Sequence, residues 1–88
     1  VVIRSPMVGT FYRAPQPGAP PFVEVGQAVK RDSVVGIIEV MKLMNSITAG
    51  VHGTVEQILV GDASQVEAGQ PIIVIRPNLT MGTDERYE

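Results

Sequence analysis

The sequence lacks cysteine and tryptophan altogether, and its 88 residues include a single histidine. Without cysteine, the chain has no means of forming disulfides or thiolate metal sites. Aromatic residues make up 5% of the chain, so aliphatic side chains must fill most of the core. The sequence also has no apolar run long enough to span a membrane and no segment with the pattern of a secretory signal peptide. We therefore expect neither a membrane partner nor a metal.

Charge is balanced, with seven basic and nine acidic residues and a net charge of −2. This balance provides no basic surface for a nucleic acid partner. The histidine, His52, has no serine, cysteine or carboxylate at the spacing of a catalytic triad or a metal site, so no catalytic residue is predicted. The length fits one domain with one core. Because the chain begins at Val1 and not at a methionine, we expect it to be a piece of a longer polypeptide.

The chain does contain a series of short β-branched runs separated by Gly, Pro and Asp, which is typical of short strands joined by turns. No stretch has the apolar period of a helix. Several runs are apolar at successive positions, which favours an all-β sandwich or flattened barrel. We place the domain at residues 1–76 and expect residues 77–88, which lose the apolar rhythm, to form a mobile tail. Strands are predicted at residues 1–4, 8–12, 22–25, 34–40, 43–48, 53–60 and 71–76.

An internal repeat gives more information about the architecture. "GTF" at residues 9–11 returns as "GTV" at residues 53–55, and "VKRDSVVGII" from Val29 returns as "VEAGQPIIVI" from Val66. The offset is seven residues shorter for the second pair, so the first copy must hold an insertion of about that length. The segment "RAPQPGAPP" at residues 13–21 is the candidate. Two similar halves that share one core predict a quasi-twofold β architecture with one projecting loop.

The repeat also places one lysine. Lys42 lies between a predicted strand that ends at Val40 and another that begins at Leu43, so it belongs to a tight hairpin turn. The quasi-twofold relation predicts that this turn and the C-terminal exit after Ile75 lie at opposite ends of the molecule. Met41 and Leu43 bracket the tip, where both side chains cannot be buried, and they offer an apolar handle to a partner.

These residues resemble a known family. "EVMKLMN" at residues 39–45 is similar to the biotin-attachment motif of biotinyl carrier domains, usually Glu-Ala-Met-Lys-Met-Met-Asn, with Val40 and Leu43 as departures. The segments "SPMVGTFYR", "FVEVGQ" and "GQPIIVI" resemble biotin carboxyl carrier proteins of bacterial and plastid acetyl-CoA carboxylases. The resemblance covers residues 1–75.

The resemblance implies a fold of two four-stranded antiparallel sheets, with covalent biotin on Lys42. Met41, Leu43 and Glu39 would be recognised at the attachment turn by a biotin protein ligase. The implied role is that of a non-catalytic carrier, which shuttles a carboxyl group from a biotin carboxylase to a carboxyltransferase in acetyl-CoA carboxylase. The implied compartment is the bacterial cytoplasm or the plastid stroma.

The insertion resembles the thumb of this family. Its prolines stiffen it, and Gly18 permits it to turn back. Our hypothesis is that the thumb folds towards the Lys42 turn and holds the biotin ring weakly. The thumb comprises Arg13, Ala14, Pro15, Gln16, Pro17, Gly18, Ala19, Pro20 and Pro21.

Several alternatives remain open from the sequence. The chain could carry biotin for another carboxylase, serve as a lipoyl carrier, or be an unmodified structural module. Lys42 could be an ordinary solvated lysine, and Met41, Leu43 and Met44 could be core residues. Glu39 could be an ordinary solvent-facing strand residue, and the thumb a passive loop.

Overall fold

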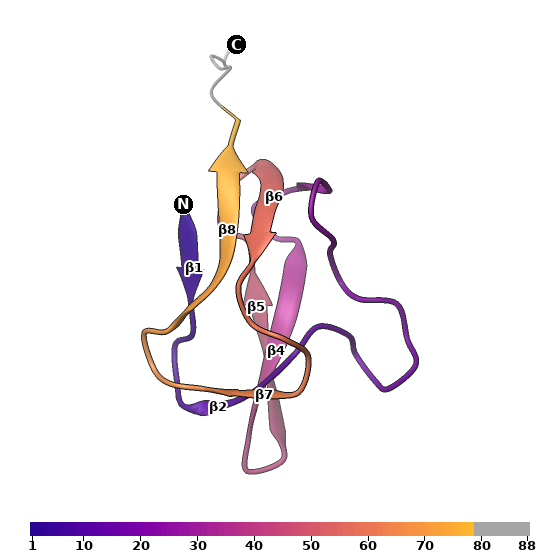
Figure 1. Cartoon of the computed structure of the whole chain (residues 1–88), viewed down its shortest axis with the longest axis vertical. Helices are drawn as coiled ribbons and strands as arrows, with labels where there is room; N and C mark the ends of the chain where they lie inside the picture. Colours follow the sequence, from indigo (N-terminus) through magenta and orange to yellow (C-terminus); the bar gives the residue numbers. More distant parts are fainter. Residues whose placement is uncertain (79–88) are drawn as a thin grey trace.

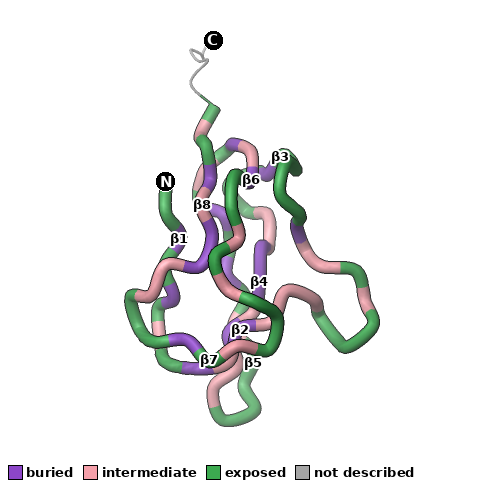
Figure 2. The backbone as a smooth tube through the Cα atoms, viewed as in Figure 1, coloured by how far each residue is buried: buried purple, intermediate pink, exposed green. Residues whose placement is uncertain are grey.

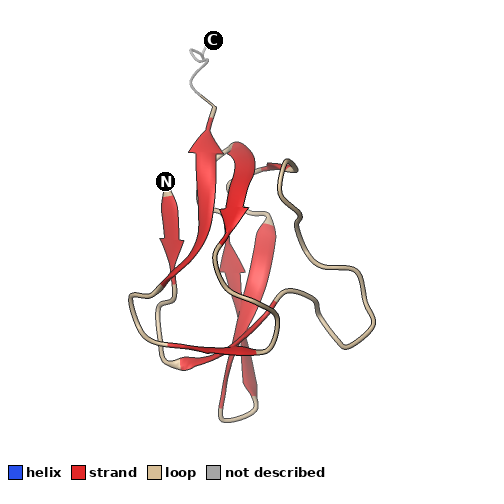
Figure 3. Ribbon diagram, in the orientation of Figure 1, coloured by secondary structure: helices blue, strands red, loops and turns tan. Residues whose placement is uncertain are grey.

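The structure, a computed structural model, describes residues 1–78 and consists of eight short β-strands and connecting loops (Figures 1 and 3). No helix in this part of the chain is long and apolar enough to cross a membrane. Most of the predicted tail, residues 79–88, lies outside the described residues. The strands are β1 (Val2–Arg4), β2 (Gly9–Tyr12), β3 (Ala28–Val29), β4 (Val34–Val40), β5 (Leu43–Thr48), β6 (Gly53–Ile58), β7 (Ser64–Val66) and β8 (Pro71–Pro77).

The strands form two four-stranded antiparallel sheets, with the orders β1-β8-β6-β3 and β5-β4-β2-β7. The all-β fold predicted from the sequence is therefore confirmed. Exchanging β1 with β5, β2 with β6, β3 with β7 and β4 with β8 converts one order into the other. This exchange is the quasi-twofold relation that the repeat predicted.

The relation extends to individual hydrogen bonds. The Lys30 N–H donates to Ser33 Oγ at 2.8 Å, and the Glu67 N–H donates to Gln70 Oε1 at 2.9 Å. Residues 30 and 33 have the same places in the first half as residues 67 and 70 in the second. The two turns are thus closed in the same way by different side chains.

Each half supplies the two central strands of one sheet and the two edge strands of the other. The first half provides β2 and β4 to the centre of one sheet, while its β1 and β3 flank β8 and β6 of the second half. Among the described residues the core contains one fully buried aromatic ring and is otherwise aliphatic, as the composition predicts. Figure 2 shows where the buried positions lie along the backbone. The core members are Ile3, Phe11, Val23, Val29, Val35, Ile38, Ile47, Ala49, Val55, Val66, Ile72, Ile73 and Ile75.

Six of the seven predicted strands are present, with ends shifted by up to two residues, but the strand at residues 22–25 is wrong. Val23 is buried, which accounts for the apolar pattern. The Phe22 N–H, however, donates to the Arg13 carbonyl at 2.7 Å and closes a loop, so no strand forms there. The short strands β3 and β7 were not predicted, because Ala28–Val29 and Ser64–Val66 contain too few apolar residues to give a period.

The Lys42 turn and the end of β8 lie at opposite ends of the molecule. Figure 1 shows the β4–β5 hairpin at the bottom and the end of β8 at the top, so the chain leaves β8 at the end opposite the Lys42 turn. The arrangement agrees with the position that the repeat predicts for this turn. The hairpin tip therefore lies far from the point where the described chain ends.

The repeated glycines, Gly9 and Gly53, allow a close approach of two strands. A Cβ atom at Gly9 would lie 2.8 Å from Ile38 Cγ2 and press on the Glu39 carbonyl oxygen. One at Gly53 would lie 2.8 Å from Ile75 Cγ2 and press on the Arg76 carbonyl oxygen. The same contact thus selects glycine in both halves.

We predict that Gly9→Ala and Gly53→Ala each lower the free energy of unfolding by about 1–3 kcal/mol, because backbone and core must move to admit the methyl group. Urea unfolding monitored by circular dichroism measures the change. Gly61→Ala is the control, since its Cβ would meet only Ser64 Oγ, at 3.4 Å, and it should alter stability little. Equal stability of all three variants would contradict the close-approach account.

Candidate functional site

The turn between β4 and β5 has two residues, Met41 and Lys42, and Val40 pairs with Leu43 across it. Both turn residues have positive φ angles, +51° and +68°, as in a type I′ turn. The tight turn predicted for Lys42 is therefore present. Such turns favour Asn-Gly, and a side chain in the left-handed region costs of order 1 kcal/mol or more. Met41 and Lys42 thus occupy this turn against its conformational preference.

The apolar side chains around Lys42 are exposed. Met41 is 90% exposed, Leu43 70% and Met44 60%, so the alternative that they belong to the core is wrong. We call these three residues the apolar tip. Because they contribute little burial to the fold, they remain available for contact with another molecule.

Glu39 contacts a residue that the sequence analysis did not single out. The Tyr12 hydroxyl donates to Glu39 Oε1 at 3.1 Å, from β2 to β4. This hydrogen bond, and then the negative charge of Glu39, raise the pKa of Tyr12; desolvation and the charge of Asp62 act in the same direction. Tyr12 thus stays a neutral donor that orients the Glu39 carboxylate beside the turn. Glu39 is not simply a solvated strand residue.

The base of the thumb is fastened to the rest of the domain. The Arg13 N–H donates to Asp62 Oδ1 at 2.7 Å, and Arg13 Nη2 donates to the Val23 carbonyl at 3.2 Å. The thumb also turns on itself, since the Ala19 N–H donates to the Gln16 carbonyl at 3.1 Å. The Arg13 guanidinium lies 3.9 Å from an exposed Glu24 carboxylate, a contact that contributes little.

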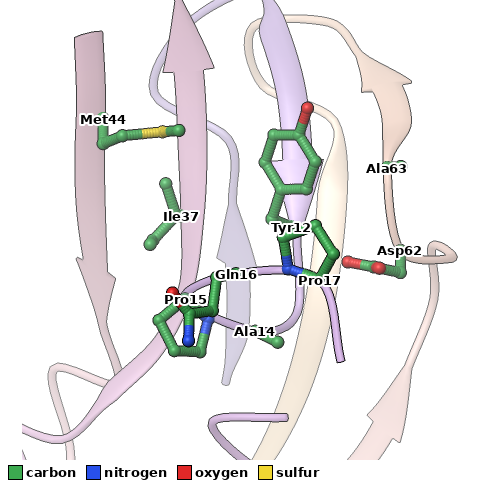
Figure 4. A pocket seen from close by; sticks show the side chains of 9 residues that line it. All are labelled: Tyr12, Ala14, Pro15, Gln16, Pro17, Ile37, Met44, Asp62 and Ala63. Carbon is green, nitrogen blue, oxygen red and sulfur yellow. The ribbon is translucent and has the colours of Figure 1, made fainter. Parts of the chain in front are cut away.

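A cavity of about 280 Å³ lies between the thumb and the outer face of the sheet β5-β4-β2-β7 (Figure 4). Its walls are mainly apolar, and the polar residues among them are Tyr12, Gln16 and Asp62. Met44, two residues after Lys42, forms part of one wall. The thumb thus lies over the sheet face that leads to the turn. The lining residues are Tyr12, Ala14, Pro15, Gln16, Pro17, Ile37, Met44, Asp62 and Ala63.

In the described part of the chain, non-glycine residues with left-handed backbone occur at the Lys42 turn and at the cavity. Between residues 1 and 78, the non-glycine residues with positive φ are Met41, Lys42 and Ala63. Ala63 lines the cavity and has a φ of +60°, whereas the equivalent position in the first half is Gly26. Strained residues that persist in a fold cluster at functional sites, which supports the turn and the cavity as one candidate site.

Not every predicted residue contributes to this arrangement. Gly18, Ala19, Pro20 and Pro21 of the thumb do not line the cavity. His52 is exposed, and its carbonyl accepts a hydrogen bond from the Asn78 N–H. Within the described residues, no three His, Cys, Asp or Glu side chains are grouped so that they could hold a metal ion.

Sequence comparisons agree on one family. Residues 1–75 match a family model described as biotin-requiring enzyme. The chain is 55% identical over 74 residues to the biotin carboxyl carrier protein of acetyl-CoA carboxylase of Pseudomonas aeruginosa, a match that covers 84% of this chain and 47% of that protein. It is 53% identical over 75 residues to the chloroplastic counterpart of Glycine max, covering 85% of this chain and 29% of that protein. The chain therefore spans half or less of the length of these relatives.

A solved structure supports the same fold. The crystal structure of the Kluyveromyces lactis urea carboxylase contains a region that superposes with a TM-score of 0.73 at 32% sequence identity. The match covers 86% of this chain and 6% of that enzyme.

We predict that Glu39→Gln lowers the pKa of Tyr12, because the substitution removes the carboxylate that disfavours the phenolate. NMR titration of the Tyr12 ring resonances measures the shift. Glu56→Gln, an exposed carboxylate on the other sheet, is the control and should leave the titration unchanged. An unaltered Tyr12 pKa in Glu39→Gln would contradict the pairing.

The same proton affects stability. Because the folded chain binds the phenol proton more tightly than the unfolded chain, this contribution is complete below the unfolded tyrosine pKa and is lost as pH rises through the raised value. Tyr12→Phe should therefore show a shallower loss of stability in the alkaline range, measured by urea unfolding across pH.

Proposed function

The chain belongs to the family of biotin-requiring enzymes, and from that premise we propose that it is a biotinyl carrier domain with Lys42 as its attachment point. The observation that carries the proposal is the strained, solvent-exposed Met41-Lys42 turn with its apolar tip, at the end opposite the chain's exit from β8. A turn built for folding alone would favour Asn-Gly and polar neighbours.

The chemistry of the turn requires a second protein. An ordinary lysine amine is almost wholly protonated at neutral pH and is a poor nucleophile in that form. A ligase must therefore activate the carboxyl group of biotin and remove a proton from the lysine amine so that the amine can attack. We propose that it recognises the apolar tip together with the Glu39 carboxylate, which Tyr12 holds in place. The amide bond removes the lysine charge and leaves a flexible arm.

The residues present fit biotin as the cofactor. Lys42 offers an accessible nitrogen, and the cavity beside Met44 offers apolar walls with a few polar groups for a small bicyclic ring. When bound, biotin supplies the capacity to carry a carboxyl group, while the protein supplies position and delivery. The rigid hairpin presents the arm, and the thumb limits its resting positions.

We place the domain in acetyl-CoA carboxylase as a non-catalytic carrier between a biotin carboxylase and a carboxyltransferase. The names of the bacterial and chloroplastic relatives support this assignment. They also support the bacterial cytoplasm or the plastid stroma as its compartment. The alternative is a carrier role in another biotin-dependent carboxylase, and the structural match to urea carboxylase supports it.

Coexpression with a biotin protein ligase should add one biotin to the chain, at Lys42. Lys42→Arg keeps the positive charge but removes the competent nucleophile, so it should abolish the adduct and leave the unfolding curve nearly unchanged. Intact mass and streptavidin retention report the adduct. Lys30→Arg is the matched control and should be biotinylated normally. Retention of the Lys42→Arg variant, or an adduct mapped to Lys30, would refute the assignment.

The thumb is proposed to hold the biotin ring in the cavity by weak contacts. Hydrogen bonds donated by the Gln16 amide or accepted by the Tyr12 hydroxyl oxygen would contribute about 1 kcal/mol each, so the ring would still leave readily for a partner enzyme. A strong clasp would be a disadvantage, since each 1.4 kcal/mol of holding costs a factor of about ten in the free population.

Biotinylation should therefore shift the NMR amide signals of residues 13–21. Replacing residues 14–20 with a short glycine linker should leave biotinylation intact, because the ligase is proposed to bind the Lys42 turn. The replacement should, however, increase the mobility of the biotin ring. If biotinylation leaves the thumb amide shifts unchanged, and the deletion variant is carboxylated as the parent is, the thumb does not hold the ring and acts only as a spacer.

A further inference from the structure

In the described part of the chain, the methionine sulfur atoms are unevenly distributed between the core and the apolar tip. The sequence has no cysteine and four methionines, of which Met7, Met41 and Met44 lie in the described part. Met41 is 90% exposed and Met44 60%, whereas Met7 is half-buried and packs against the core. Two accessible thioethers therefore flank Lys42, one on each side.

An exposed thioether is a target for hydroperoxides. The sulfur lone pair attacks the outer oxygen of hydrogen peroxide, the O–O bond breaks, an S–O bond forms, and water leaves. Sulfur is oxidised by two electrons and the peroxide is reduced by two. The product, methionine sulfoxide, is polar, and methionine sulfoxide reductases return it to the thioether.

We propose that Met41 and Met44 form a reversible oxidation site whose sulfoxides weaken the ligase's recognition of the Lys42 turn. The second half of this inference rests on the function proposed above. Oxidation converts two of the three side chains of the apolar tip into polar ones, and Leu43 alone remains apolar. Met44 also lines the cavity beneath the thumb, so its sulfoxide places a polar group in that wall.

The site is suited to control because its oxidation spares the fold. Neither Met41 nor Met44 belongs to the buried cluster or to the residues packed against it. Their side chains can therefore change polarity without opening the core. Oxidation of Met7, which does pack against the core, would be expected to lower stability instead.

The first test treats the unmodified chain with hydrogen peroxide, removes the oxidant with catalase, and maps the added oxygen by peptide mass. Among Met7, Met41 and Met44, Met41 should oxidise first and Met44 second, both several-fold faster than Met7. An equal or faster rate at Met7 would overturn the oxidation site. Because this measurement uses no ligase, its result is independent of the proposed function.

The second test compares the oxidised and untreated chains as ligase substrates. Oxidation should raise the KM for the chain several-fold, leave the melting temperature unchanged, and be reversed by methionine sulfoxide reductases. Each variant is compared with its own untreated form: Met41→Leu/Met44→Leu should lose the sensitivity, and Met7→Leu should keep it. An unchanged KM after oxidation, or a sensitive double variant, would overturn the inference. If the untreated chain is not biotinylated, the proposed function is wrong, and so is the inferred effect of oxidation on ligase recognition.

Discussion

The exchange of edge strands between the two halves is the constraint on which the rest of the structure depends. The centre of each sheet comes from one half and its edges from the other, so a half alone would leave β1, β3, β5 or β7 without a partner. The core between the sheets closes only when both halves are present. Such interlocking explains how a chain with 5% aromatic residues and no disulfide can hold a rigid hairpin.

The hairpin that carries Lys42 draws its rigidity from this exchange. Its first strand, β4, is central and bonded on both sides, to β2 and β5, and Ile38 fixes it to the core. The strain of a left-handed Met41-Lys42 pair is therefore imposed by a well-anchored strand. The thumb is fastened in a similar way, since Asp62 from the loop between β6 and β7 fixes its base. Both parts of the candidate site thus rest on contacts between the halves.

The sequence could predict features that depend on local pattern or on the repeat. The Lys42 turn follows from two strands separated by two residues, and the quasi-twofold sheets follow from the recurring blocks. Tyr12, Asp62 and Ala63 could not be found in this way, because their roles depend on strand register and on a contact between distant loops. The strand at residues 22–25 was predicted wrongly for the same reason, because strand pairing cannot be derived from the local sequence pattern. Burial of Val23 produces an apolar pattern whether or not a neighbouring strand exists to pair with it.

The central claim is that the Met41-Lys42 turn is shaped for a partner at the expense of folding, and one variant tests both parts. Met41→Gly should raise the free energy of unfolding by about 1 kcal/mol, because the strain removed exceeds the extra chain entropy of glycine, and it should slow biotinylation by the ligase. Val25→Gly, an exposed apolar position without positive φ, is the matched control and should lower stability while leaving biotinylation unchanged. Urea unfolding and the initial rate of biotin incorporation, measured on the same samples, decide the matter. A Met41→Gly chain that is less stable than the parent, or one that is biotinylated at the parent's rate, would contradict the claim.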